Sequence, residues 1–343
     1  MIITRTPFRL SLGGGGTDLP SYYSKYGGFI FAAAIDKYMF ININRPLVDD
    51  KIRMHYSSSE EVDHVDDLRH ELARETLKLN GIHKAIEIVS LADVPAGAGM
   101  GSSSAYTVGL LKAVHQIKQD PLSQKALAEE ACKIEIEILK KPIGKQDQYV
   151  SAFGGFPILE INRMGEVTIR QANVTYEVVL ELERNIQLFY TGSTRSAYDI
   201  LVDQDRATKQ DKSRVVDFLH RIKEIGKKIL QAIEKKDLST FGLLMDQHWK
   251  AKKQLSGKIS TSQIDRLYER AKKKGALGGK IIGAGGGGFL MFYCEEGHQK
   301  LREAMREEGL RYLPFRFDFE GSKILTDFMN TRSGMHWKQE CSS

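Results

Sequence analysis

The chain has 343 residues, of which 41% are apolar and 27% charged, enough to fill one large core or, more plausibly, two ordinary ones. The formal net charge of +6 favours anionic partners, but the basic residues are scattered among 44 acidic ones, which indicates small phosphorylated ligands and no nucleic acid. Cys132, Cys294 and Cys341 lie far apart, which excludes a disulfide framework and predicts a reducing compartment.

Neither a signal peptide nor a membrane span is indicated. The N-terminal sequence MIITRTPFRL lacks the charged lead and long apolar core of a signal peptide. The longest near-apolar run, Ile281 to Tyr293, is too short and too rich in glycine to cross a bilayer. We therefore expect a cytoplasmic protein without a membrane partner.

The first half of the chain mixes strand-like and helix-like segments. Alternating apolar residues predict strands at Tyr38–Arg45 and Ala85–Leu91. Apolar residues at helical spacing predict helices at Asp66–Asn80, from about Ser102 onward, and at Gln124–Leu139, where Pro142 and Gly144 follow.

A new pattern starts near residue 180, which predicts two domains, 1–180 and 181–343. The second half begins with an apolar strand, Ile186–Gly192, and continues with charged helices. Three helices are expected, at Arg214–Lys235, Leu238–Leu255 and Ser262–Lys274, before the glycine-rich segment Gly278–Tyr293.

The stretch PAGAGMGSSSA, Pro95–Ala105, lies between a predicted strand and a predicted helix. Its three glycines allow the backbone to pass close to a ligand, and the helix start adds free amide groups and the positive end of the helix dipole, so the stretch predicts a phosphate cradle. A glycine loop with a serine cap is the alternative. No lysine follows the last glycine, which excludes a Walker A loop, and Ser102 breaks the dinucleotide fingerprint.

A second stretch, GAGGGG at Gly283–Gly288, contains G-x-G-x-x-G as a bare string. The strand-like FLMFY follows it where a Rossmann turn needs a helix, which disfavours an oxidoreductase that binds a nicotinamide or flavin. A strand, glycine loop and strand fit better. Such a loop either forms a plain hairpin or presses its backbone against a phosphate site.

The third stretch, RLSLGGGGTD, ends on Thr17 and Asp18. Its glycines bring the backbone close to a polar ligand, and the two side chains can bind vicinal hydroxyls. Capping of the next helix is the more frequent role of such an acid.

Phosphoryl transfer also needs a divalent metal and an acceptor for the proton of the attacking hydroxyl. The helix at 124–139 carries Glu129, Glu130, Glu135 and Glu137, although charges on a helix are usually solvated. Asp147 lies in a short polar insert between apolar residues, where a partly buried acid needs a functional partner.

With these residues in view, the sequence resembles the GHMP kinases, the family named for galactokinase, homoserine kinase, mevalonate kinase and phosphomevalonate kinase. PFRLSLGGGGTD, PAGAGMGSSSA and KIIGAGGGGFLMFY resemble its three motifs in order. GGGGTDLPSYY, GKQDQYVSAFGG, YTGSTRSAYDIL and MDQHWKAKKQLS resemble the sugar anomeric kinases that act on D-glycero-D-manno-heptose 7-phosphate, with fucokinases nearby. Galactokinases carry Glu-His where this chain has Gly15 and Gly16.

The resemblance implies an α+β fold of two domains, a ribosomal-protein-S5-domain-2-like N-terminal domain and a ferredoxin-like C-terminal domain, with the site between them. It implies that ATP is bound by Pro95, Gly97, Ala98, Gly99, Met100, Gly101, Ser102, Ser103 and Ser104. It further implies that Mg2+ is held by Ser103 and Glu135, with Ser104 and Glu137 as rivals.

The resemblance also assigns the reacting groups. Asp147 takes or orients the proton of the sugar hydroxyl, and Arg9 steadies charge on the transferred group. The implied substrate-binding residues are Gly15, Gly16, Thr17, Asp18, Arg195, Gly285 and Gly286.

The expected reaction is ATP-dependent phosphorylation of the anomeric hydroxyl of the heptose 7-phosphate, which gives the 1,7-bisphosphate. Arg195 and the basic run Lys250, Lys252 and Lys253 are candidates for the substrate phosphate, although solvated helix charge is the usual role of such lysines. A fucokinase, another sugar 1-kinase and a non-catalytic sugar-phosphate sensor are the alternatives. The oligomeric state is left open, with a homodimer among the choices.

Overall fold

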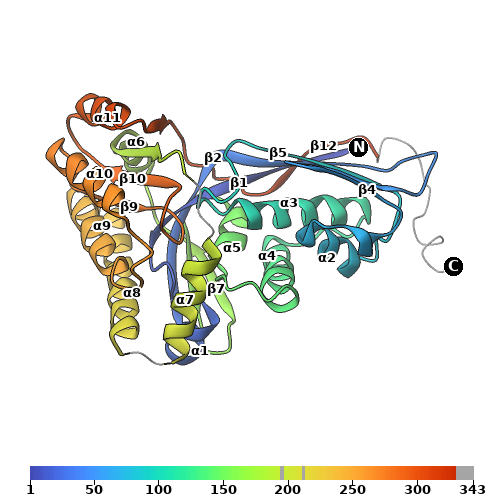
Figure 1. Ribbon diagram of the computed structural model, residues 1–343, viewed down its shortest axis with the longest axis horizontal. Coiled ribbons are helices and arrows are strands. Elements are labelled where there is room, and N and C mark those ends of the chain that lie inside the picture. The colour runs from blue at the N-terminus through green and yellow to red at the C-terminus, as the bar shows by residue number, and fades with distance from the viewer. Residues whose placement is uncertain (194–196, 211–212, 330–343) are drawn as a thin grey trace.

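A computed structural model describes residues 1–193, 197–210 and 213–329 of the chain. Two separate β-sheets, each with its own helices, form two halves that lie side by side (Figure 1). The α+β class expected from the sequence is confirmed. Among the described helices, none is long and apolar enough to cross a membrane.

The first sheet is built on two long strands, β1 (Ile2–Gly13) and β2 (Gly28–Asn44), which pair along most of their length. The order across the sheet is β12-β1-β2-β5-β3-β4, and β6 joins the beginning of β2. Its pairs are antiparallel except β3 with β5. The other strands are β3 (Ile52–His55), β4 (Ser59–Val62), β5 (Ile86–Ala92), β6 (Pro157–Ile161), β7 (Val167–Gln171) and β12 (Lys323–Asp327).

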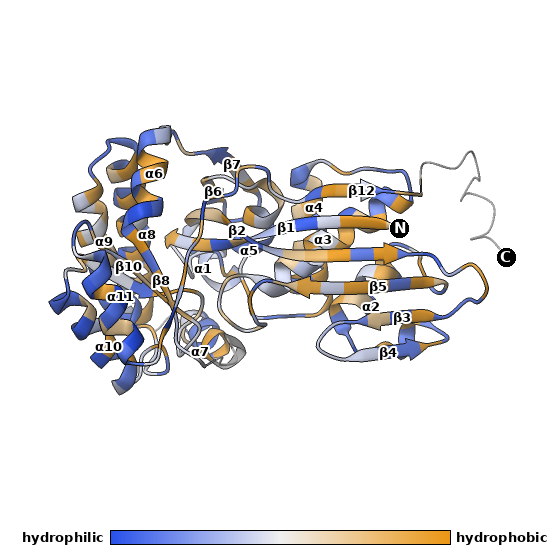
Figure 2. Ribbon diagram, turned by 90° about the horizontal axis from the view of Figure 1, so that it is seen from above, coloured by the Kyte–Doolittle hydropathy of each residue, from blue (hydrophilic) through white to orange (hydrophobic). Residues whose placement is uncertain are grey.

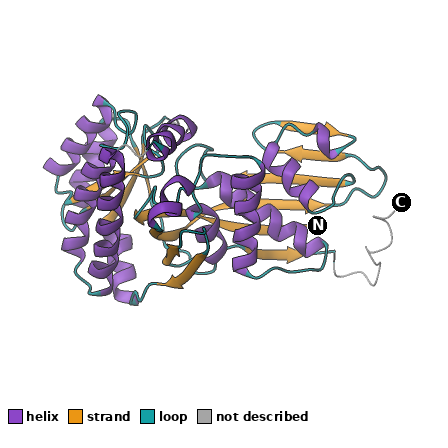
Figure 3. Cartoon of the chain, turned by 90° about the horizontal axis from the view of Figure 1, so that it is seen from below, coloured by secondary structure: helices purple, strands orange, loops and turns teal. Residues whose placement is uncertain are grey.

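Helices cover one face of this sheet (Figure 3). The central helix α3 packs on β1 and β2, and twelve of its sixteen residues are buried, so it lies inside the first half. The helices of this half are α1 (Pro20–Tyr26), α2 (Glu71–Leu79), α3 (Ser102–Ile117), α4 (Gln124–Cys132) and α5 (Gln146–Phe153), with a 3-10 turn at Val65–Asp67 and a π-helical turn at Lys133–Ile138.

The second sheet has the order β11-β8-β10-β9 with antiparallel pairs throughout. Counted along the chain this is 4-1-3-2, the order of a ferredoxin-like sheet, which confirms that prediction. Its strands are β8 (Ile186–Tyr190), β9 (Gly278–Ile281), β10 (Phe289–Tyr293) and β11 (Arg311–Leu313), and its helices are α6 (Tyr176–Asn185), α7 (Ala197–Lys209), α8 (Ser213–Glu234), α9 (Leu238–Lys252), α10 (Ser262–Lys273) and α11 (His298–Glu307).

Helix α8 connects the two halves, because it packs on α9 and also on β1 and β2 of the first sheet. The burial pattern along β1 agrees with this contact. At Ile2–Arg5 only alternate residues are buried, whereas every residue from Thr6 to Gly13 is buried. The second part of β1 is therefore covered on both faces, and its end is placed between the halves.

Most predicted elements are present, with three differences. The helix expected at 66–80 begins only at Glu71, and the one expected at 124–139 becomes π-helical after Cys132. The chain also returns to the first sheet, where β12 pairs with β1 (Figure 2). The boundary expected at residue 180 falls inside α6 and stays a prediction.

Candidate active site

The loop Pro95–Ser104 joins β5 to α3, and its glycines adopt positive φ angles. These are 76° at Gly97, 83° at Gly99 and 78° at Gly101, conformations that residues with a side chain avoid. Gly101 occupies the capping position without a side-chain hydrogen bond, so the serine-cap alternative is wrong and the first amide groups of α3 remain free for an anion. Ala98 and Met100 are buried beneath the loop.

Arg9 on β1 and Asp147 on α5 form a two-pronged ion pair beside this loop. Nε of Arg9 donates to Oδ1 of Asp147 at 2.7 Å, and Nη2 donates to Oδ2 at 2.9 Å. Nη1 of Arg9 donates to the carbonyl oxygen of Gly99 at 2.5 Å. Arg9 is buried, whereas Asp147 remains partly exposed in the cavity. The two residues expected to react are thus together at the loop.

Glu135 lies on the π-helical turn, which changes the direction of its side chain relative to a regular helix. Its carboxylate is fully buried and accepts hydrogen bonds from Oγ of Ser104 at 3.1 Å and Nε2 of Gln148 at 3.2 Å. Burial raises its pKa to about 7, although Lys141 opposes that shift. Glu137 is exposed, and so is Ser103, which lines the same cavity. Glu135 and Ser104 therefore form the buried pair.

The loop after β1 brings Asp18 to the other side of the cavity. Oδ1 of Asp18 accepts from the amide of Gly16 at 3.1 Å, and Oδ2 accepts from the amide of Gln146 at 3.0 Å. Burial raises the pKa of Asp18 despite these hydrogen bonds. Gly15, Gly16 and Asp18 line the cavity, as expected.

Thr17 is placed differently from the expectation. Its hydroxyl is fully buried and donates to the carbonyl oxygens of Gly14 and Phe29, at 2.8 Å each. It also accepts from the amide of Phe29 at 3.1 Å. The hydroxyl of Thr17 holds the loop in place behind the cavity.

The glycine-rich segment after β9 joins it to β10, so the expected order of strand, glycine loop and strand is present. Its first glycine touches the phosphate loop: a Cβ on Gly283 would lie 2.7 Å from Cα of Gly99. Gly283 and Ala284 line the cavity. Gly285 and Gly286, expected to face the substrate, instead contact Ile259, whose carbonyl oxygen accepts from the amide of Gly286 at 2.9 Å.

The candidates for a substrate phosphate separate into two groups. Lys250 pairs with Asp246 at 2.7 Å and Lys253 with Asp265 at 2.9 Å, on the outer surface of α9. Only Lys252 lines the cavity. Arg195 lies outside the described residues.

Several residues of the cavity had no predicted role, among them His248 on α9 and Lys280 on β9. These two each lay within a stretch that resembles the family. Lys280 interrupts an otherwise apolar buried strand, and that interruption is the signal that could have identified it.

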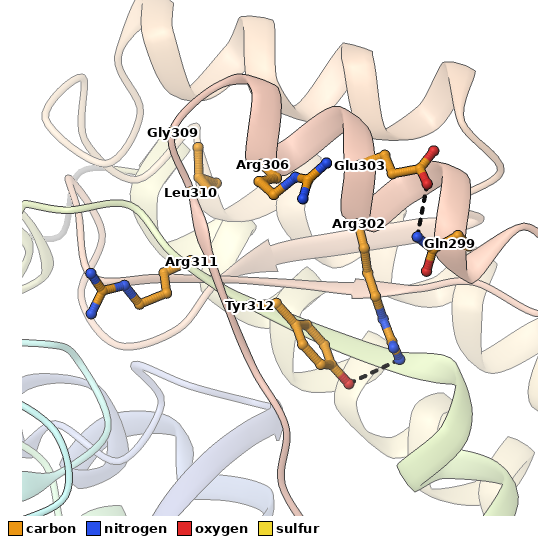
Figure 4. A pocket seen from close by; sticks show the side chains of 8 residues that line it. All are labelled: Gln299, Arg302, Glu303, Arg306, Gly309, Leu310, Arg311 and Tyr312. Carbon is orange, nitrogen blue, oxygen red and sulfur yellow. Dashed lines mark hydrogen bonds between the residues drawn. The ribbon is translucent and has the colours of Figure 1, made fainter.

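A second cavity, of about 410 Å3, lies between α11 and β11 (Figure 4). Its chemistry is different. Arg302 stacks over the ring of Tyr312 at 4.1 Å and donates to Gln187 at 2.7 Å, so its guanidinium is already used. Arg311 extends away from the other labelled side chains (Figure 4). This cavity lacks both a glycine loop and an acid–base pair.

The first cavity thus combines free amide groups at a helix start, an Arg–Asp pair and a loop with a buried acid, which fit a phosphotransferase with a hydroxyl acceptor. The comparisons with known proteins agree. The model of the GHMP kinases N terminal domain matches residues 67–155, and that of the GHMP kinases C terminal domain matches residues 229–310. The chain belongs to the GHMP kinase family, whose members use ATP.

Two relatives support a sugar kinase in particular. The chain is 30% identical over 337 residues to the D-glycero-alpha-D-manno-heptose 7-phosphate kinase of Campylobacter jejuni, covering 94% of this chain and 98% of the relative. A crystal structure described as a D-glycero-D-manno-heptose 1-phosphate kinase from Bacteroides thetaiotaomicron superposes with a TM-score of 0.80 at 25% identity, over 96% of this chain and all of that one. A bifunctional fucokinase of Arabidopsis thaliana is 25% identical over 65% of this chain and only 21% of its own length. The protein is a sugar kinase.

Proposed function

We propose that this enzyme transfers the γ-phosphoryl group of ATP to the anomeric hydroxyl of D-glycero-D-manno-heptose 7-phosphate and releases the 1,7-bisphosphate and ADP. The observation that carries the proposal is the position of the Arg9–Asp147 pair between the phosphate loop and the Asp18 loop. The full-length similarity to a heptose 7-phosphate kinase supports the choice of acceptor.

In the proposed reaction, Asp147 receives the proton of the anomeric hydroxyl while the sugar oxygen bonds to the γ-phosphorus and the bond to the β-phosphate oxygen breaks. A carboxylate held by arginine is a weak base, but an anomeric hydroxyl is more acidic than an ordinary alcohol, so a weak base suffices. Arg9 touches both Asp147 and the phosphate loop, which suits it to stabilise charge on the phosphoryl group in transit.

The acceptor is oriented from the other side. The backbone at Gly15 and Gly16 leaves room for a sugar ring, and the carboxylate of Asp18, fixed by two amides, can accept hydrogen bonds from sugar hydroxyls. Most of the rate acceleration comes from positioning two bound substrates and from fixed charges.

Glu135 and the serines at the start of α3 fit a magnesium ion. A fully buried carboxylate whose pKa is near 7 needs a cation to remain ionised, and the Ser104 hydroxyl lies 3.1 Å from it. The described residues contain no group of three or more His, Cys, Asp and Glu side chains that could hold a metal ion, so phosphate oxygens and water would complete the shell. The ion would neutralise charge on the ATP phosphates. Ser103, which lines the cavity beside Ser104, is the second serine whose hydroxyl could bind the magnesium ion.

Two further parts of the proposal concern organisation. We assign residues 1–180 and 181–343 to two domains with the cavity between them, with the exception of β12, which adds to the sheet of the first. Cys132 and Cys294 are unbonded and buried, which agrees with a reducing cytoplasmic setting where ATP and sugar phosphates are abundant.

The test is ATP consumption against a panel of free sugars and sugar phosphates, with kcat/KM compared and the product identified by phosphorus NMR. We expect the heptose 7-phosphate to give the highest kcat/KM and a second phosphate at the anomeric carbon. A preference for fucose, or a product phosphorylated at another carbon, contradicts the proposed acceptor. Ligand binding without ADP release would indicate a sensor.

A further inference from the structure

Three basic side chains meet in the cavity without an acidic partner. His248 and Lys252 lie one turn apart on α9, and Lys280 comes from the neighbouring strand β9. His248 and Lys280 are each 1% exposed, and Lys252 is partly buried. The proposed transfer step assigns no role to any of these three side chains.

Their hydrogen bonds go to the backbone or are missing. Nζ of Lys280 donates to the carbonyl oxygen of Leu12 at 3.2 Å, and Nζ of Lys252 donates to that of Gly283. Both ring nitrogens of His248 are buried without a hydrogen-bond partner. Within the described ranges, no carboxylate forms an ion pair with Lys252 or Lys280.

Burial of these basic side chains lowers the stability of the folded protein unless a bound anion compensates their charge. Burial and the nearby charge of Arg9 lower the pKa of Lys252 to about 7, and burial, Lys252 and Arg9 lower the pKa of Lys280 well below its usual value. Burial and the two lysines lower the pKa of His248 as well. A bound dianion would reverse these shifts.

The cluster extends from the glycine loops toward the acceptor turn: Lys252 donates to the carbonyl oxygen of Gly283, which touches Gly99 of the phosphate loop, and Lys280 lies at the other end. Arg9 contacts the phosphate loop through Gly99, whereas Lys280 reaches Leu12, on the strand that leads into the Gly15–Gly16 turn. Gln204 of α7 approaches the same turn, since its Nε2 would lie 2.6 Å from a Cβ on Gly16. The cluster therefore adjoins the acceptor side of Arg9.

We propose that His248, Lys252 and Lys280 form a subsite for a phosphate group that the acceptor already carries, remote from the hydroxyl that reacts. The inference rests on the proposed kinase function of the cavity, but it requires only that the acceptor is a phosphorylated sugar. The two lysines neutralise the dianion, and His248 donates a ring N–H to one of its oxygens.

The test compares two acceptors that differ only in this group, the heptose 7-phosphate and the unphosphorylated heptose, at saturating ATP. Wild-type enzyme should prefer the phosphorylated acceptor in kcat/KM. Lys280→Met should lower that preference roughly 30- to 100-fold, mostly through KM, because one buried partner of the phosphate is lost. Lys252→Met, at a partly exposed position, repeats the test if Lys280→Met does not fold.

Lys272→Met is the matched control. Lys272 also donates to a backbone carbonyl, that of Leu277 at 2.6 Å, but lies on α10 outside the cavity, and the preference should stay within twofold. Equal losses of kcat for both acceptors would place the cluster on the transferred phosphoryl group and overturn the proposal. A wild-type enzyme indifferent to the second phosphate would also overturn it.

The two proposals can fail separately. If the heptose 7-phosphate is not a substrate while another sugar phosphate is preferred over its free sugar, and Lys280→Met removes that preference, the subsite stands and the heptose assignment fails. If the heptose 7-phosphate is turned over with a preference that the variants keep, the assignment stands and the subsite fails.

Discussion

In the proposed reaction, Asp147 is the residue on which the chemistry depends most directly. Arg9 holds both of its carboxylate oxygens, and Nε2 of Gln146 donates to Oδ1 at 3.1 Å. These contacts fix the carboxylate in the cavity before any substrate binds. Arg9 and Gln146 thus set the orientation of the Asp147 carboxylate that would accept the proton.

Asp147→Asn keeps the shape of the side chain and removes its basicity. We expect kcat to fall roughly 100- to 10,000-fold, the usual contribution of a general base, while the Kd for ATP changes little. Steady-state kinetics and nucleotide titration measure the two quantities. Glu137→Gln, at an exposed position on the π-helical turn, serves as the control. A kcat within tenfold of the wild type would remove Asp147 from the proposed role.

A pH dependence follows from Lys252. Burial and the nearby charge of Arg9 lower the pKa of the Lys252 side chain to about 7. Lys280 and His248 are the other titratable groups that interact with it. A bound phosphate dianion favours the charged lysine, so the complex holds more protons than the free enzyme and affinity falls as pH rises above 7. KM for the phosphorylated acceptor should increase several-fold between pH 7 and 8.5. Lys252→Arg, which stays charged, should flatten this profile, and an equally steep profile in the variant would contradict the assignment.

At this scale the sequence predicted the acids better than the bases. Asp18, Glu135 and Asp147 do line one cavity, together with Arg9. Arg9, Asp18 and Asp147 belong to motifs with distinctive neighbours, whereas Glu135 was singled out among four helix glutamates only by the resemblance. His248 could not be recognised, since a buried unpaired base is defined by what surrounds it in space, whereas Lys280 gave one signal, its interruption of an apolar strand. Thr17 was expected in the site for its chemistry, yet the backbone of its own loop uses its hydroxyl.

Among the elements, the contact between the two glycine loops has the clearest consequence. Gly99 and Gly283 have φ angles of 83° and 80°, and their backbones touch. The hairpin of the second half therefore helps to shape the phosphate loop of the first.

Gly283→Ala should disturb this contact, because the new Cβ would lie 2.7 Å from Cα of Gly99 and 2.8 Å from its carbonyl oxygen. We expect a rise of about tenfold in KM for ATP, measured by steady-state kinetics. Gly81→Ala is the control: its φ is 71°, but a Cβ there meets nothing within 4 Å. It shares the backbone strain without the contact, so equal effects on KM would show that the contact does not matter.

Elements with a regular period were predictable, and elements defined by distant partners were not. The hydrophobic period identified β8, α8, α9 and α10 to within a few residues. The π-helical turn that carries Glu135 keeps helix-like composition, so the period does not distinguish it. Strand β12 is short and partly exposed, and only its pairing with β1 defines it.

For the whole molecule, a second close approach of the two halves is at Gly226 of α8. A Cβ on Gly13 would lie 2.6 Å from Cα of Gly226, so the helix and the end of β1 are in backbone contact. The turn that we propose to bind the acceptor starts directly after this contact.

Gly226→Ala sets two effects against each other. Alanine favours a helix by about 1 kcal/mol over glycine, but its Cβ would lie 2.7 Å from the amide nitrogen of Gly14. We expect the clash to win, with Tm lower by about 3–8 °C and a raised KM for the acceptor. Lys228→Ala, exposed on the same helix, should change Tm little. An unchanged or higher Tm for Gly226→Ala, in a thermal melt, would show that α8 can move away from β1 without a loss of stability.

The pairing of β12 with β1 has a consequence for biosynthesis. Translation delivers Thr326 over 300 residues after its partner Ile3, a delay of roughly 15–60 s at ordinary elongation rates. During that interval the outer edge of β1 has no neighbour, and an unprotected edge invites association with other nascent chains. Chaperone shielding of the emerging polypeptide should therefore matter most until its last strand leaves the ribosome.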